Sequence, residues 1–364
     1  MPANKLLSGY RVLDLSQYIP GPFATRMLAD LGAEVIKIEP PAGDPMRSFM
    51  FSGSADEVSP IYRHLNRGKT VALLNLKEKQ DKQHLTRLLR GADVLLESYR
   101  PGVLARLGFD RERLQAINPR LVHCALSGFG QTGPFRDRAG HDLTYCAVSG
   151  ALSASGTVKQ PVMTYPPIAD HAGAMQAVNA VLAALLSRER SGKGIYLDIS
   201  LTESILSWQY IGLAESQNRD EQLREQLLLN GGAACYNIYS TADERFVVLA
   251  ALESKFWKAF CRQLDRPDWL ARQHEALPQT GLIAELQALF SSRPLTAWQA
   301  LLAEADCCFE PVAAFAESAI HPQFAARAAV TGLQPGYPGW IDGAAVATAS
   351  DYVELEAGQA PLWD

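Results

Sequence analysis

Hydrophobic positions in the first third of the chain form short β-branched runs separated by segments with helical periodicity. Five runs predict strands, over Arg11–Ser16, Glu34–Glu39, Thr70–Leu76, Ala92–Glu97 and Leu121–Leu126. Helices are predicted between them, including one that ends near Asp30 and one over Lys77–Arg90. Strands that alternate with helices indicate a mostly parallel sheet covered by helices on both faces. We therefore expect an α/β domain.

The pattern changes in the second half of the chain. A long helix is predicted from Asp170 to about Arg190, then a last sheet strand over Ile195–Ser200 and a helix over Glu203–Gln217. After a charged connector, a strand at Phe246–Ala251 precedes three helical segments, around Lys255–Leu264, Gly281–Phe290 and Leu295–Ala305. The predicted organisation is a large domain over 1–217, a linker over 218–230, a smaller α+β domain over 231–320, and a segment over 321–364 that returns to the large domain.

Composition narrows the class of protein. The chain has 364 residues, 48% hydrophobic and 20% charged, with a net charge of -5, which disfavours a nucleic-acid binder that relies on global charge. Its six cysteines show no C-x-x-C spacing, so we expect reduced thiols and no metal site. Neither a signal-peptide core in Met1–Arg11 nor a run long enough for a bilayer is found. A soluble, cytoplasmic protein without membrane partners is expected.

Asp170 is the leading candidate for chemistry. It follows Pro166-Pro167 and precedes small residues, at the predicted first turn of the long helix. Unpaired amides and the helix dipole stabilise a carboxylate there as an anion. The alternative is a simple helix N-cap, a position where Asp is common.

The segment Gly128-Phe-Gly-Gln-Thr-Gly133 matches a G-x-G-x-x-G motif and follows a predicted strand. A dinucleotide site also needs a helix that begins at the third glycine. The polar run Pro134-Phe-Arg-Asp-Arg138 follows instead. The segment is therefore interpreted as a glycine loop beside an active site, and a nicotinamide dehydrogenase is the weaker alternative.

An ordered set of motifs resembles the class III CoA-transferase and α-methylacyl-CoA racemase family. It begins with Leu13-Asp-Leu-Ser-Gln-Tyr-Ile-Pro-Gly-Pro22 and Leu28 to Pro40. It continues with Asn66-Arg-Gly-Lys-Thr70, Tyr99-Arg-Pro-Gly102, Gly128 to Pro134 and Ser191-Gly-Lys-Gly194. The resemblance implies a Rossmann-like large domain and an interlocked homodimer, with the active site between the large domain of one subunit and the small domain of the other.

The family implies two chemistries for the aspartate that matches Asp170. In the transferases the carboxylate attacks an acyl-CoA thioester and forms an acyl anhydride. In the racemases an acid/base pair removes and returns the proton next to the thioester carbonyl, through an enolate. Coenzyme A then enters as part of the substrate, and no tightly bound cofactor is expected.

Three segments resemble the racemase branch. Ala139-Gly-His-Asp-Leu-Thr-Tyr145 implies that His141 is the second base, and imidazole titrates near neutrality. Leu249-Ala-Ala-Leu-Glu253 implies that Glu253 orients this histidine, and Leu229 to Tyr236 resembles the racemase entry to the small domain. Alternatively, His141-Asp142 only begins a helix over Leu143–Leu152, and Glu253 is only an acid at a helix start.

The resemblance also implies the residues that hold coenzyme A. These are Tyr18, Arg67, Leu74, Ser98, Tyr99, Arg100 and Arg106. For Lys69, a solvated surface charge is the better interpretation. The chain departs from the family at Asn230, where racemases commonly have Asp, and at Pro40, where many members have an Arg for the nucleotide.

The sequence therefore predicts an epimerase that inverts the α-carbon of a 2-methylacyl-CoA. The alternatives are a CoA-transferase that uses Asp170 as nucleophile and a CoA-binding protein without activity. The identity of the acyl group, and of the acceptor acid of a transferase, is not encoded in any motif.

Overall fold

The computed structural model describes residues 5–49, 58–217, 223–356, 359 and 361–363. The chain divides into two compact units. The first comprises Met1–Ser149, Tyr165–Trp208 and His321–Asp364, and the second comprises Gly150–Thr164 and Gln209–Ile320. The carboxyl-terminal segment thus belongs to the same unit as the amino-terminal half of the chain.

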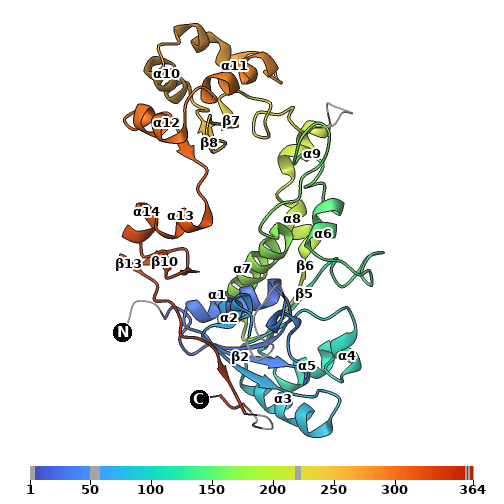
Figure 1. The fold of residues 1–364 in the computed structure, drawn as a ribbon. Coiled ribbons are helices and arrows are strands. Elements are labelled where there is room, and N and C mark those ends of the chain that lie inside the picture. Colours follow the sequence, from blue (N-terminus) through green and yellow to red (C-terminus); the bar gives the residue numbers. More distant parts are fainter. Residues whose placement is uncertain (1–4, 50–57, 218–222, 357–358, 360, 364) are drawn as a thin grey trace. The chain divides into compact units, whose positions relative to one another are not determined.

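The first unit is built on one seven-stranded parallel sheet, in the order β14-β3-β2-β1-β4-β5-β6 (Figure 1). Its strands are β1 (Arg11–Leu15), β2 (Glu34–Glu39), β3 (Lys69–Leu73), β4 (Val94–Glu97), β5 (Val122–Ser127), β6 (Tyr196–Ser200) and β14 (Val353–Glu354). The first six follow the order of a dinucleotide-binding fold, which reverses direction between β1 and β4. The prediction of an α/β fold with a mostly parallel sheet is confirmed.

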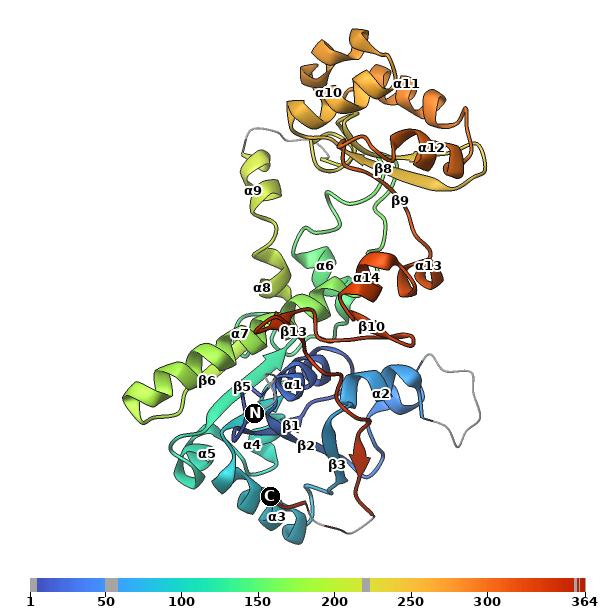
Figure 2. The ribbon, with the colours of Figure 1, turned by 90° about the vertical axis from the view of Figure 1, so that its left-hand side faces the viewer.

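Helices cover both faces of this sheet (Figure 2). The helices of the first unit are α1 (Pro20–Asp30), η1 (Pro45–Arg47), α2 (Pro60–Asn66), α3 (Lys79–Gly91), α4 (Val103–Arg106), α5 (Arg111–Ile117), α6 (Asp142–Val148), α7 (Ile168–Ser191), α8 (Leu201–Leu206) and α14 (Pro322–Ala326). Leucines of α3, α4 and α5 pack with Leu13, Ile36 and Leu95 in one core, while α1 and α7 contact each other. The C-terminal segment adds two small hairpins, β10 (Val330–Thr331) with β11 (Gln334–Pro335) and β12 (Trp340–Ile341) with β13 (Ala344–Ala345).

The second unit has an antiparallel sheet of β7 (Tyr236–Ser240), β8 (Phe246–Ala250) and β9 (Phe309–Pro311). Its helices are α9 (Tyr210–Ser216), α10 (Ser254–Gln263), η2 (Pro267–His274), α11 (Thr280–Phe290), α12 (Leu295–Leu302) and α13 (Phe315–Ala319). Three fully buried tryptophans, Trp257, Trp269 and Trp298, lie in its core. Among the described residues, no helix combines the length and apolarity needed to cross a bilayer.

The observed units differ from the predicted domain boundaries at residues 150–164 and 209–217, which group with the second unit. Residues 150–164 join it through hydrogen bonds to the turns at 223–230. The Arg224 Nε donates to the Thr157 carbonyl at 2.7 Å, and the Asn230 Nδ2 donates to the Ala154 carbonyl at 3.1 Å. Such contacts leave no periodicity in the sequence. Residues 218–222 of the predicted linker lie outside the described residues.

The single helix predicted over Glu203–Gln217 is divided into α8 and α9. The Ser204 hydroxyl donates to the Ser200 carbonyl at 2.7 Å, and the Ser207 hydroxyl donates to the Ser204 carbonyl at 2.7 Å. Serine hydroxyls that bond to preceding carbonyls compete with the helical hydrogen-bond pattern. Hydrophobic periodicity alone does not show this break.

Candidate active site

A cavity of about 480 Å³ lies at the carboxyl ends of β1, β4 and β5 in the first unit. The loop after β1 contributes Gln17 and Tyr18, the loop after β4 contributes Ser98 to Arg100, and the loop after β5 contributes Gly128 and Phe129. Open α/β sheets bind their ligands at this point, where the strand order reverses. The volume lies in the range of small-molecule sites.

Asp170 lines this cavity from the first turn of α7. Burial, with a smaller contribution from the nearby Asp142 carboxylate, raises the pKa of Asp170 to about 7. No hydrogen bond to its carboxylate is found among the described residues. The side chain is therefore a carboxyl group that exchanges a proton near neutral pH.

Asp142 supplies the cap that Asp170 was alternatively expected to supply. One oxygen of Asp142, Oδ1, accepts hydrogen bonds from the backbone N–H groups of Ala169 at 2.6 Å and Asp170 at 3.1 Å. These two amides belong to the first turn of α7, which has Pro167 at its N-cap and no cap from that side chain. Since Asp142 accepts hydrogen bonds from both amides, the Asp170 carboxylate does not serve as the cap of α7. The interpretation of Asp170 as a simple N-cap is wrong.

His141 lines the same cavity from the N-cap position of α6. The Thr144 hydroxyl bonds both the N–H of His141 at 3.0 Å and its carbonyl at 2.7 Å, which fixes the backbone. The His141 ring meets the Tyr18 ring edge to face, with centroids 5.7 Å apart. The structure thus brings an imidazole and a carboxyl group with a near-neutral pKa to one cavity, although His141 also begins a helix.

Tyr18 holds a backbone conformation that is uncommon for residues other than glycine, with φ 64°. Its N–H donates to the Asp44 Oδ1 at 3.3 Å, and Asp44 in turn pairs with Lys37 at 2.9 Å. Such strain is maintained only where the surroundings enforce it. The buried Lys37–Asp44 pair therefore holds the backbone of Tyr18, whose ring lies beside His141.

The glycine motif makes room for Tyr145. A Cβ atom added to Gly128 or to Gly140 would lie 2.6 Å from the Tyr145 ring or hydroxyl. Burial, with contributions from Asp170 and Asp142 against that of Arg100, raises the pKa of Tyr145 to about 12, so the phenol stays protonated. No helix begins at Gly133, and Gly128 and Phe129 line the cavity instead.

Three arginines line the cavity, namely Arg100, Arg136 and Arg138. Arg100 was predicted from its motif, whereas Arg136 and Arg138 were missed. Both lie in the polar run after the glycine motif, which sequence analysis treated only as a loop. The sequence does place Arg136 and Arg138 two residues apart, directly after a glycine loop at the end of a strand. That arrangement could have indicated an anion-binding loop. Guanidinium groups bind phosphates well because their donors match phosphate oxygens.

Tyr18, Ser98, Tyr99 and Arg100 of the predicted coenzyme A residues line the cavity, and three others do not. Arg67 is buried; its Nη2 pairs with Asp30 at 3.3 Å and its Nη1 donates to the Pro335 carbonyl at 3.0 Å. Leu74 belongs to the hydrophobic core, and Arg106 is exposed at the end of α4. Arg67 and Leu74 thus have structural contacts in this chain.

Lys69 is not the solvated surface charge suggested by the sequence. Its side chain is fully buried, and Nζ donates to the Asp14 Oδ2 at 3.0 Å and the Asn66 Oδ1 at 3.1 Å. Asp14 lies on β1, which β2 separates from the strand of Lys69 in the sheet, and no hydrophobic pattern reveals this pairing. The lysine is part of a buried ion cluster.

Glu253 lies in the second unit as the N-cap residue of α10. Its carbonyl accepts from the N–H groups of Phe256 at 3.0 Å and Trp257 at 3.2 Å. Its side chain is not a cap, so the carboxylate is available for another contact. Among the described residues, no group of three or more His, Cys, Asp or Glu side chains is placed to hold a metal ion.

Comparisons with known proteins identify the family. The model of CoA-transferase family III matches residues 7–362. The chain is 33% identical to acetyl-CoA:oxalate CoA-transferase of Acetobacter aceti, over 92% of this chain and 89% of that one. It is 34% identical to α-methylacyl-CoA racemase of Homo sapiens, over 86% of this chain and 80% of that one. A crystal structure of a CAIB/BAIF family protein from Brucella suis matches with a TM-score of 0.82 and 27% identity, covering 96% of each chain. The chain belongs to CoA-transferase family III, whose members act on CoA thioesters.

Proposed function

We propose that this protein is an acyl-CoA epimerase that inverts the α-carbon of a 2-methylacyl-CoA thioester. The observation that supports it is the pair of residues in one cavity, Asp170 with its pKa near 7 and His141. Inversion needs two groups that both gain and lose a proton near neutral pH, on opposite faces of one carbon. The similarity to a racemase over most of the chain agrees with this function.

The reaction follows from the two side chains. One of them removes the α-proton, and the electron pair of the broken C–H bond moves into the thioester carbonyl to form an enolate. The other group, protonated beforehand, delivers its proton to the opposite face of the carbon. Asp170 and His141 then have exchanged protonation states, and exchange with solvent restores them. No acyl group moves and no external reactant is consumed.

The arginines of the cavity fit the phosphates of coenzyme A in this proposal. Arg100, Arg136 and Arg138 supply cationic forks, while Tyr18 and Tyr99 supply aromatic walls. Arg106 remains a candidate for an outer phosphate. Glu253 of one subunit is proposed to orient His141 of the other in an interlocked homodimer. The enzyme is proposed to be cytoplasmic.

Exchange with heavy water tests the proposal. The enzyme is incubated in D2O with one epimer of a 2-methylacyl-CoA and no free acid, and the α-position is followed by mass and chiral analysis. Uptake of one deuterium with loss of stereochemical purity is expected. A thioester that stays unlabelled and stereochemically pure across several acyl chains would overturn the proposal.

A CoA-transferase is the second candidate, because the chain is equally similar to an acetyl-CoA:oxalate CoA-transferase. Here Asp170 attacks the thioester, releases the CoA thiolate and carries the acyl group as an anhydride. His141→Ala separates the two functions. The variant should lose inversion, whereas a transferase should retain part of its acyl transfer to an acceptor acid. Full epimerase activity in this variant would contradict the role of His141 as a base.

A further inference from the structure

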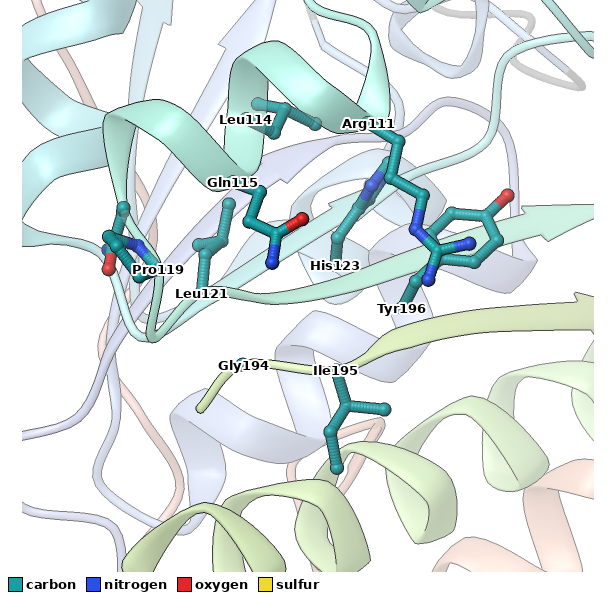
Figure 3. Close-up of a pocket in the computed structure, with 10 residues that line it drawn as sticks. Arg111, Leu114, Gln115, Pro119, Leu121, His123, Gly194, Ile195 and Tyr196 are labelled. Atoms are coloured by element: carbon teal, nitrogen blue, oxygen red, sulfur yellow. The ribbon is translucent and has the colours of Figure 1, made fainter. Parts of the chain in front are cut away.

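A second cavity lies at the other end of β5 from the candidate active site, and Figure 3 shows the residues that line it. It has a volume of about 70 Å³ and lies between α5 and the amino ends of β5 and β6. His123 and Tyr196 are paired residues of these two strands, and both line it. Along β5, His123 is four residues from Ser127 of the first cavity, a distance of roughly 13 Å. The two cavities are separate.

His123 is a buried polar side chain without a hydrogen-bond partner. Only 8% of the residue is exposed, and neither Nδ1 nor Nε2 has a partner among the described residues. The Glu97 carboxylate lies 3.9 Å from Nε2, which is beyond hydrogen-bond distance. Burying an imidazole with unmet donors is costly. A group that enters the cavity would remove this cost.

Arg111 places a cation at the same cavity. Its guanidinium carbon lies 4.9 Å from the centre of the Tyr196 ring, within the range of a cation–π contact. No ion pair of Arg111 is found in the described part of the chain. Burial, with contributions from Asp198 and Glu97 against that of Arg111, raises the pKa of Tyr196 to about 12, so this phenol adds no charge. The guanidinium of this exposed residue therefore has donors without a partner in the described part of the chain, beside a neutral ring.

The remaining lining is mixed. Leu114, Leu121 and Ile195 provide apolar walls, and Gln115 and Asn118 provide side-chain amides. Figure 3 shows Arg111, His123 and Tyr196 gathered at one end of the cavity. A water molecule occupies about 30 Å³ in the liquid, so the cavity holds only a few non-hydrogen atoms. The donors suit an acceptor of negative charge, because a guanidinium group offers five N–H donors and no acceptor atom.

We propose that this cavity binds a small oxyanion, either inorganic phosphate or a short carboxylate, through Arg111 and His123. The oxygens accept from the guanidinium of Arg111 and from a ring N–H of His123. The charge of Arg111 offsets the repulsion from Glu97 behind the imidazole. The alkyl part of a short carboxylate would contact the apolar walls, whereas phosphate would use the donors of Arg111 and His123 alone.

Calorimetric titration of the full-length protein with phosphate and, separately, acetate tests this site. Coenzyme A is added in excess to occupy the first cavity, and chloride keeps the ionic strength constant. Saturable binding with a Kd on the order of 1 mM is expected for at least one anion. A tighter Kd for phosphate or for acetate identifies which source of oxyanion the site prefers.

Matched variants locate the binding. Arg111→Gln should weaken it by at least ~10-fold, whereas Arg113→Gln, an exposed arginine of the same helix that does not line the cavity, should leave it unchanged. His123→Gln should also weaken anion binding. If this variant of a buried residue does not fold, the result for Arg111→Gln decides whether the site exists. Absence of saturation up to about 50 mM of either anion, or equal affinities in the two arginine variants, would overturn the proposal.

Discussion

Two aspartates of the same unit, the fully buried Asp14 on β1 and the partly buried Asp170 on α7, have pKa values displaced in opposite directions. Burial alone would raise the pKa of both. At Asp14 the charges of Lys69 and Lys37, together with hydrogen bonds from Ser16 and Thr25, outweigh burial and hold the pKa well below its usual range. Among the described residues, neither a cation nor a hydrogen-bond donor lowers the pKa of Asp170, and the Asp142 carboxylate adds to the effect of burial.

The more deeply buried of the two carboxylates has the lower pKa, so charged partners and hydrogen-bond donors outweigh burial in setting the charge of Asp14. Asp14 is a permanent anion that joins β1 to β3 through Lys69 at 3.0 Å. Asp170 keeps a proton available near pH 7 in a cavity open to substrate. A stabilised charge is suited to structure, and a destabilised one is suited to proton transfer or nucleophilic attack.

Asp170→Asn is expected to give the largest effect. Either proposed chemistry loses its reacting group, so activity should fall by at least ~10³-fold. Stability should change in the opposite direction. The folded-state pKa of about 7 lies above the ordinary value of 3.8, so ionisation opposes folding increasingly as pH rises through this window. The variant should match the wild type near pH 4 and be roughly 1–3 kcal/mol more stable at pH 8, as measured by urea unfolding. Lower stability at pH 8 would contradict the raised pKa.

Asp14→Asn should reverse the stability effect. The substitution leaves Lys69 and Lys37 buried without their shared anion, which costs about 3–5 kcal/mol. The free energy of unfolding in urea at pH 7 measures this loss. Asp110→Asn, at the N-cap of α5, is the control, because asparagine also caps helices and should cost much less. Equal losses of unfolding free energy in the two variants would show that the charge of Asp14 in the ion cluster stabilises the fold no more than the charge of Asp110 at its N-cap.

Thr25→Val tests the hydrogen-bond share of the Asp14 environment. The Thr25 hydroxyl donates to the Asp14 Oδ2 at 2.6 Å, and valine has nearly the same shape. Loss of a hydrogen bond to a charged group should cost about 1.5–3 kcal/mol. The matched control is Thr86→Val, whose hydroxyl donates to the neutral Lys82 carbonyl at 2.7 Å and should contribute less. A smaller loss for Thr25 than for Thr86 would assign the stabilisation of Asp14 to the lysines alone.

Asp142→Asn tests the contribution of the Asp142 charge to the pKa of Asp170, and it should give the smallest effect of these substitutions. Asparagine keeps the oxygen that accepts from Ala169 and Asp170 but removes the neighbouring negative charge. The pKa of Asp170 should fall by about one pH unit, toward its ordinary value. If ionised Asp170 is the active form, the acidic limb of the pH profile of kcat/KM moves down by the same amount. An unmoved limb would assign the raised pKa to burial only.

Local patterns in the sequence determined the elements of the sheet. The strand predicted over Glu34–Glu39 has these bounds in the structure, and the predicted helix from Asp170 to Arg190 lies within α7. Period and turn residues act over short range, so they are present in the sequence itself. The ordered motifs also indicated the family, and the pairing of Asp170 with His141 as candidate bases came from that resemblance.

The tertiary structure decided the environment of each charged side chain. The sequence does not show that Asp142 caps a helix 28 residues later, that Lys69 is buried against Asp14, or that Arg67 pairs with Asp30. These contacts join strands and helices distant in the chain, and their energies depend on burial and partners rather than on residue type. For the same reason, His123 and Arg111 carried no signal until α5 folded over the amino ends of β5 and β6. Sequence fixes which groups are present, but only packing determines their charge and neighbours.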